Sequence, residues 1–267
     1  TNLLAGATNA SVTVSNAQPV NAGGYSVVVS NVAGSVTSVV ATLTVLVPPS
    51  VTVQPTNVTV NALTDAGFTV SATGTLPLTY RWEKDGMVVG GATSAALTLN
   101  AVTTNSVGSY RVVITNVAGS VTSSVAVLAV NRLVPVLTWA TPAAITYGTT
   151  LGAAQLNASA GVAGSYAYSP AAGTLLGAGT RALGVTFTPT DSSVYVPNAA
   201  GVNLVVNAAA LTVTAQNQTR EYGQANPVLT VSYSGFVNGE TAAVLLTPGV
   251  AMTTADLTSL PGSYVIA

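Results

Sequence analysis

One stretch of sixteen residues occurs twice in the chain, and it constrains the fold more than any other feature. Residues 108–123 read GSYRVVITNVAGSVTS, and residues 23–38, 85 positions earlier, read GGYSVVVSNVAGSVTS. Each copy has a tyrosine near its start, a short Val-rich run, an Asn-Val-Ala-Gly turn and a second run of Ser, Thr and Val. Two β-branched runs that flank such a turn predict a β-hairpin. The chain is therefore expected to contain β domains in tandem.

The rest of the composition also predicts an all-β protein. Hydrophobic residues make up 49% of the chain, yet they are interleaved with Thr, Ser, Asn and Gly. This alternation is typical of strands, because successive side chains face opposite sides of a sheet. No apolar run approaches the roughly 20 residues that a membrane-spanning helix needs, so no membrane span is predicted in this segment. A length of 267 residues allows two to four small domains.

Charge is scarce and narrows the range of partners. Only 5% of the residues are charged, the net charge is −1, and the first charged side chain is Asp65. Without a basic cluster, electrostatic capture of nucleic acid or anionic lipid is not expected. A surface with so little charge repulsion favours self-association, either into fibres or with neighbouring domains of the same long chain.

The 85-residue repeat and two proline-containing linkers suggest the domain organisation. Residues 1–46 align with about 86–131, so the first copy begins in the middle of a repeat. Pro48 and Pro49 form one linker and residues 132–135 form a second, since proline cannot donate to a sheet ladder. We expect four parts: the C-terminal part of a domain over 1–46, a complete domain over 50–131, a third domain over 133–207, and a truncated one over 208–267.

The complete unit has the strand pattern of a β-sandwich. Strands are expected over residues 66–74, over 79–84 before an Asp85-Gly86 turn, at 88–89 and at 95–99, before the 108–123 hairpin. Six or seven short strands with turn signals between them indicate two packed sheets.

The residues of this unit resemble an intermediate-set immunoglobulin domain. The run VSATGTLPLTYRWEKDG is followed by LTL and then GSYRVVITNVAG. The resemblance implies that Trp82 is the buried tryptophan of strand C and that Tyr110 forms the tyrosine corner, with Val70 and Val112 in place of the two family cysteines. In the first copy, Tyr25 and Val27 match Tyr110 and Val112. A cysteine-free sandwich of this kind needs no oxidation during export, and it fits bacterial surface proteins.

The last two units resemble other repeats of bacterial surface proteins. Residues 180–195, TRALGVTFTPTDSSVY, are similar to bacterial Ig-like repeats. Residues 220–229 and 231–241, REYGQANPVL and VSYSGFVNGET, resemble the MBG repeat. The Tyr147-Gly148 and Tyr222-Gly223 pairs lie 75 residues apart, which suggests a distant duplication of the two units.

The residue inventory gives no support for catalysis, a cofactor or a metal site. The chain has no His and no Cys, and Lys84 is its sole lysine. General acid–base work and nucleophilic triads require a base beside the reacting group. Glu83 and Asp85 are close in sequence, but at the end of a strand they are expected to form a solvated edge. Asp191 is expected to form an Asx-type turn, and Arg81 and Arg111 to form a surface ion pair with Glu83.

These observations favour a non-enzymatic role outside the cell. We expect a stalk, adhesin shaft or extracellular filament of a large bacterial surface or secreted protein. The alternative is a module that binds a glycan or a host protein through loops at the sandwich ends, in which Tyr168 and Tyr195 are candidate loop residues. The incomplete terminal domains are expected to be completed either by the same longer chain or by a neighbouring subunit.

Overall fold

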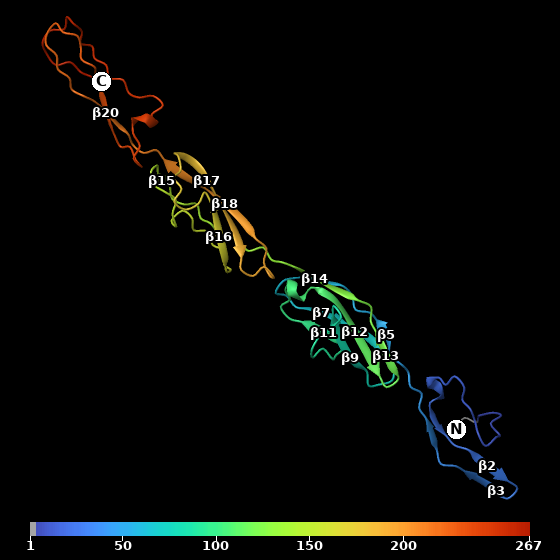
Figure 1. Cartoon of the computed structure of the whole chain (residues 1–267). Helices are drawn as coiled ribbons and strands as arrows, with labels where there is room; N and C mark the ends of the chain where they lie inside the picture. The colour runs from blue at the N-terminus through green and yellow to red at the C-terminus, as the bar shows by residue number, and fades with distance from the viewer. Residues whose placement is uncertain (1–3) are drawn as a thin grey trace. The chain divides into compact units, whose positions relative to one another are not determined.

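The computed structural model describes residues 4–267 and consists mainly of short β-strands and loops (Figure 1). The chain divides into two compact units, of which the first ends at Leu133 and the second begins at Val134. The only helical segments in residues 4–267 are three short 3₁₀ turns: η1 (Pro19–Asn21), η2 (Thr104–Ser106) and η3 (Ala242–Val244). The predicted all-β fold is confirmed.

The N-terminal part of the first unit contains two small antiparallel pairs of strands. The repeated Asn-Val-Ala-Gly turn joins β2 to β3, and β1 pairs with β4. Most side chains of these strands are exposed, although Tyr25 is half-buried. The strands are β1 (Gly23–Tyr25), β2 (Val28–Asn31), β3 (Gly34–Thr37) and β4 (Ala41–Leu43).

The rest of the first unit is a two-layer sandwich. One sheet has the order β10-β9-β12-β14-β6, with β13 also paired to β12, and the β14–β6 pair is parallel. The other layer contains the antiparallel pairs β11–β7 and β5–β8. The strands are β5 (Ser50–Val53), β6 (Val58–Asn61), β7 (Ala66–Thr69), β8 (Ser71–Thr73), β9 (Thr79–Lys84), β10 (Met87–Val88), β11 (Ala96–Leu99), β12 (Gly108–Asn116), β13 (Gly119–Thr122) and β14 (Ala126–Asn131).

The core of the sandwich comes from the alternate residues of its strands. Tyr110, Val112 and Ile114 of β12 are buried, whereas Arg111 between them is exposed. Each large apolar side chain that is buried in this way contributes about 1.5–3 kcal/mol. The buried cluster comprises Ala66, Phe68, Val70, Trp82, Leu97, Val102, Tyr110, Val112, Ile114, Ala126 and Leu128.

The strand that was predicted over residues 66–74 is interrupted at Val70. β7 pairs with β11, whereas β8 pairs with β5, so the chain changes partner between them. Val70 is buried at the change, and its backbone N–H donates to Ala95 O at 3.0 Å. Alternation of side chains continues through the switch, which is why the sequence pattern gave no sign of it.

The second unit begins with a four-stranded sheet in the order β15-β18-β17-β16. β18 pairs with β17 over residues 198–206, and its end also pairs in parallel with β15. Leu151, Leu156, Leu183, Leu204 and Val206 form the buried cluster. The strands are β15 (Ile145–Thr146), β16 (Gly164–Ser169), β17 (Gly179–Pro189) and β18 (Asn198–Asn207).

Residues 208–267 contain little regular structure. β19 (Thr212–Ala215) and β20 (Val231–Ser234) form one antiparallel pair, and η3 follows. The structure describes this whole segment, and none of its residues is buried. The segment therefore has no buried apolar core like that of the sandwich or that of the four-stranded domain.

Candidate functional site

The paired strands β9 and β12 have one face toward the core and one outer face. In this antiparallel register Val112 lies opposite Trp82, and Arg111 lies opposite Glu83. Since neighbouring residues of a strand face opposite sides, Trp82 and Val112 enter the core while Glu83 and Arg111 lie on the outer face. Glu83 and Arg111 thus lie on the outer face, next to two central core residues.

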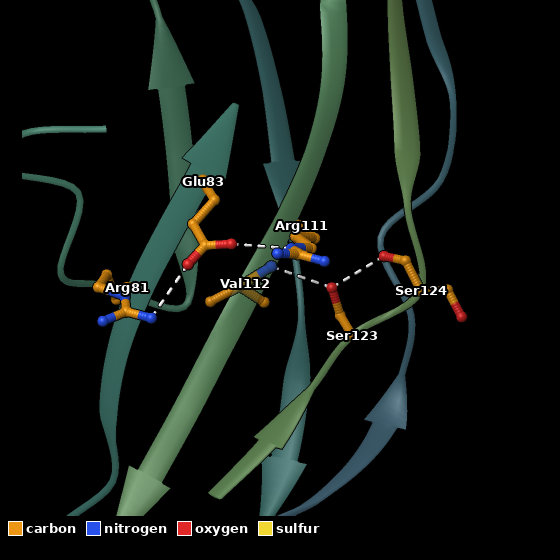
Figure 2. A network of polar contacts seen from close by, with 6 residues as sticks. All are labelled: Arg81, Glu83, Arg111, Val112, Ser123 and Ser124. Carbon is orange, nitrogen blue, oxygen red and sulfur yellow. Dashed lines mark hydrogen bonds and ion pairs between the residues drawn. The ribbon is translucent and has the colours of Figure 1, made fainter. Parts of the chain in front are cut away.

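Glu83 is held between two arginines on this outer face (Figure 2). Arg81 Nη2 donates to Glu83 Oε1 at 3.0 Å, and Arg111 Nε donates to Glu83 Oε2 at 2.8 Å. The Glu83 side chain is only 7% exposed, whereas those of Arg81 and Arg111 are 56% and 45% exposed. The predicted ion pair is present, but the expected solvated edge is wrong for Glu83, because the two guanidinium groups cover its carboxylate.

The electrostatics of Glu83 follow from this geometry. The hydrogen bond from Arg111 is the main cause that lowers the pKa of Glu83, and the charges of both arginines act in the same direction. Burial opposes the shift, since it disfavours the charged form. The carboxylate therefore stays ionised and remains hydrogen-bonded to Arg81 and Arg111.

The inner side of the same strands contains an aromatic cluster. Trp82 is fully buried, and its Nε1 donates to Ser94 O at 2.9 Å. The ring of Phe68 lies with its centroid 6.1 Å from that of Trp82 and 4.9 Å from that of Tyr110. Val70 and Val112 are buried in the same cluster. Because the indole N–H of Trp82 is hydrogen-bonded to Ser94 O, we assign this tryptophan a role in core packing.

Tyr110 ties the start of β12 to the preceding turn. Its hydroxyl donates to Ser106 O, four residues upstream, at 2.7 Å. Burial is the main cause that raises the pKa of Tyr110, and the nearby charge of Asp85 adds to it. In the first copy, Tyr25 makes the same contact with Asn21 O, also at 2.7 Å. Both repeats thus have the bond of a tyrosine corner.

Ser123 is a structural residue that the sequence reasoning missed. It is buried, its Oγ accepts from Val112 N at 3.0 Å and donates to Ser124 O at 2.8 Å (Figure 2). In the first copy, Ser38 makes both contacts, from Val27 N at 3.1 Å and to Val39 O at 2.8 Å, although Val27 itself is exposed. The signal was the identical serine at the end of both repeats, but Ser35 and Ser120 are shared in the same way.

The Asn-Val-Ala-Gly turn of the second repeat also contacts the linker that enters the sandwich. Asn116 Oδ1 accepts from the backbone N–H groups of Ala118 and Gly119 at 2.8 and 3.1 Å. Asn116 Nδ2 donates to Val47 O at 2.8 Å and to Thr75 O at 2.9 Å. The residue before Pro48 is therefore attached to the sandwich by a side-chain amide.

The other predicted site residues have internal roles. Asp85 is exposed at the turn with a φ of 50°, and it accepts from Ser109 N at 2.8 Å. Lys84 is half-buried and donates to Asn105 O. Asp191 accepts from Ser193 N at 2.9 Å, as an Asx-type turn requires, and the hydroxyl of Ser193 is the main cause that lowers its pKa.

The two candidate ligand-binding tyrosines do not lie together in an open loop. Tyr168 belongs to β16, where its ring packs edge-on against Trp139 at 5.4 Å between centroids, so its assignment to a loop was wrong. Its hydroxyl accepts from Ala158 N at 3.0 Å. Tyr195 is half-buried just after the Asp191 turn.

Two further features, a cluster of metal-ligating side chains and a membrane-spanning helix, are absent from residues 4–267. No three acidic side chains in this range converge as they would around a metal ion. No helix within the same range has the length and hydropathy needed to cross a membrane.

Family comparisons agree with two of the three resemblances seen in the sequence, the immunoglobulin domain and the MBG repeat. Residues 48–116 match the immunoglobulin domain family, and residues 211–267 match the MBG domain family of the YGX type. The chain thus carries an immunoglobulin-like domain without cysteines, followed by an MBG domain.

Individual relatives match the chain over limited parts. Endoglucanase C of Cellulomonas fimi is 42% identical over 89 residues, which are 31% of this chain and 8% of that protein. Extracellular domains 3–5 of Drosophila OTK are 21% identical, with 44% of this chain and 42% of that chain covered and a TM-score of 0.35. The N-terminal four Ig domains of Dscam1 are 31% identical, over 43% of this chain and 28% of that chain, with a TM-score of 0.37.

Proposed function

We propose that this chain is a non-enzymatic structural segment of a large bacterial protein that acts at the cell surface or after secretion. It separates other parts of that protein and transmits tension between them, as a stalk, an adhesin shaft or a filament would. The matches to immunoglobulin and MBG domains support a structural module of this general kind. The more specific role is an inference from the chemistry of the candidate site.

One observation carries the proposal: the polar groups of the candidate site in the sandwich are used in internal contacts. Glu83 is neutralised by Arg81 and Arg111, and the hydroxyl of Tyr110 is bonded to backbone. The indole N–H of Trp82 likewise donates to a backbone carbonyl. Such contacts stabilise the sandwich and engage these groups within it.

A surface-display experiment tests the spacer role. The chain is placed between an outer-surface anchor and a small reporter domain, and binding of antibody-coated beads to the reporter is counted on whole cells. We expect more beads per cell than with the reporter fused directly to the anchor. A count equal to that of the direct fusion, at equal reporter expression, would contradict the proposal.

The match to part of an endoglucanase favours a second candidate, a glycan-binding module. Aromatic rings on a sheet face can stack on sugars, and Tyr166 and Tyr168 have nearly parallel rings with centroids 6.3 Å apart. Their hydroxyls, however, already accept from the backbone N–H groups of Ala160 and Ala158. Depletion of the protein from solution by insoluble cellulose, lost in a Tyr168→Ala or a Tyr195→Ala variant, would make this candidate the better one.

A further inference from the structure

In the second unit, a Tyr-Gly turn of the four-stranded domain lies against the final segment of the chain. Tyr147 follows β15, and its hydroxyl donates to a carboxylate oxygen of Glu240. A Cβ atom built on Gly148 would lie 3.0 Å from Val237 Cγ2. Glycine at this position therefore allows the turn to approach Val237 closely, in a backbone conformation with a φ of 103°.

The contact extends beyond these two pairs. Residues of both parts line an open, mainly apolar cavity of about 260 Å³. Tyr147 and Ala178 come from the four-stranded domain, and Leu211, Phe236 and Leu245 come from the final segment. The hydrogen bond to Glu240 is the main cause that raises the pKa of Tyr147, so the phenol keeps its proton and remains a donor.

The final segment has few other apolar contacts available. Residues 208–267 include no buried residue, whereas the four-stranded domain has its own cluster around Leu183 and Leu204. A segment that cannot bury enough apolar surface is only marginally stable without an external partner. The Tyr147-Gly148 turn supplies such a partner.

The second Tyr-Gly pair of the chain is a natural comparison. Gly223 also has a positive φ, of 80°, but a Cβ atom built there would meet nothing within 4 Å. Tyr222 is 64% exposed, in contrast to the half-buried Tyr147. The turn conformation alone therefore does not require the contact, and the docking is particular to Tyr147 and Gly148.

We propose that the Tyr147-Gly148 turn is a docking surface for residues 235–245, and that the final segment depends on this docking for its order. When the docking is lost, the final segment is expected to open while the four-stranded domain keeps its own core. This inference does not rest on the spacer role, because it concerns the coupling of two folded parts.

Hydrogen exchange of the full chain, followed by mass spectrometry, tests the dependence. Tyr147→Phe removes only the hydroxyl, and Gly148→Val adds a side chain against Val237. We expect the backbone amides of β19, β20 and residues 235–245 to exchange roughly threefold to tenfold faster in Tyr147→Phe, and faster still in Gly148→Val. The matched control, Tyr222→Phe, makes the same change in the second Tyr-Gly turn and should leave these amides within about twofold of the parent.

The amides of β17 show whether the four-stranded domain itself stays folded. Gly148→Val could also accelerate amide exchange in β17, which would mean that it unfolds the four-stranded domain. In that case the result for Tyr147→Phe decides whether the docking proposal holds, since this variant adds no atom and introduces no strain. Unchanged exchange of residues 231–245 in Tyr147→Phe would overturn the proposal. Equal acceleration by Tyr147→Phe and Tyr222→Phe would overturn it too, because the effect would then not depend on docking.

Discussion

Arg111 and Glu83 face each other across the β9–β12 pair, and Arg111 Nε lies 2.8 Å from Glu83 Oε2. A cross-strand pair of opposite charges on one face of a sheet stabilises the pairing of the two strands. Here the carboxylate is also covered by Arg81, so removal of the negative charge leaves two arginines side by side without a counterion.

Glu83→Gln should therefore destabilise the sandwich in a pH-dependent way. The pKa of Glu83 is lowered in the folded state, so its ionised form contributes stability above the pKa of the unfolded chain, and this stability is lost as the pH falls through the lower, folded value. We expect a lower urea midpoint than in the parent at pH 7, and a difference that disappears in acid. Trp82 fluorescence in a Trp139→Phe background reports the sandwich alone, since the chain has two tryptophans.

The control for this charge change is Glu221→Gln, which alters an exposed glutamate outside the sandwich. Its urea midpoint, read from Trp82, should equal that of the parent at every pH. A Glu83→Gln variant with a pH-independent loss of stability would contradict the role assigned to the carboxylate charge.

Tyr110→Phe should cost the sandwich about 1 kcal/mol, because it removes the hydroxyl bond to Ser106 O and leaves that carbonyl without this donor. The loss is measured as the change in the free energy of unfolding, by urea denaturation. Tyr80→Phe is the matched control, since Tyr80 is only partly buried against the same core. Equal effects of the two variants would argue against the tyrosine corner.

Ser123→Ala should cost about 1–3 kcal/mol, since the backbone N–H of Val112 is left buried without its partner. Ser120→Ala, in the exposed part of β13, changes the same residue type and should lie within about 0.5 kcal/mol of the parent. Urea denaturation monitored by Trp82 measures both. If the two variants are equally stable, Ser123 does not have the structural role inferred from its contacts.

The positions of Val70 and Val112 predict an engineered disulfide. In a Val70→Cys, Val112→Cys variant, we expect oxidation to close an inter-sheet bridge and to stabilise the sandwich by about 2–4 kcal/mol relative to the reduced form. Because the parent chain has no cysteine, the number of free thiols in the unfolded variant shows directly whether the disulfide has formed. Two free thiols after oxidation would show that the two positions do not match the family cysteines.

Much of the sandwich could be predicted from local patterns. The Asn116 turn, the Asp85-Gly86 turn and the alternation along β12 each depend on residues that are close in sequence. The split at Val70 could not be predicted in this way, because a change of pairing partner leaves the alternation of side chains intact.

The candidate site was harder to predict than the fold for a similar reason. The position of Glu83 near the end of a strand suggested a solvated side chain, whereas its burial depends on Arg111, which lies 28 residues away. The contact of Tyr147 with Glu240 joins residues that are 93 positions apart, so no local sequence pattern could predict it. Only the register of paired strands and the docking of whole segments determine such contacts.

Single-molecule pulling of the full chain from its two ends tests the central claim, that these domains resist tension as a structural segment. We predict that residues 50–131 unfold in one discrete step. The gain in length should be about 270–300 Å, at about 3.3–3.6 Å for each residue of the extended chain, less the distance between the ends of the folded domain. Oxidation of the Val70→Cys, Val112→Cys variant should shorten this step, since the bridged residues cannot extend. A smooth extension without any discrete step, like that of a flexible coil, would contradict the account.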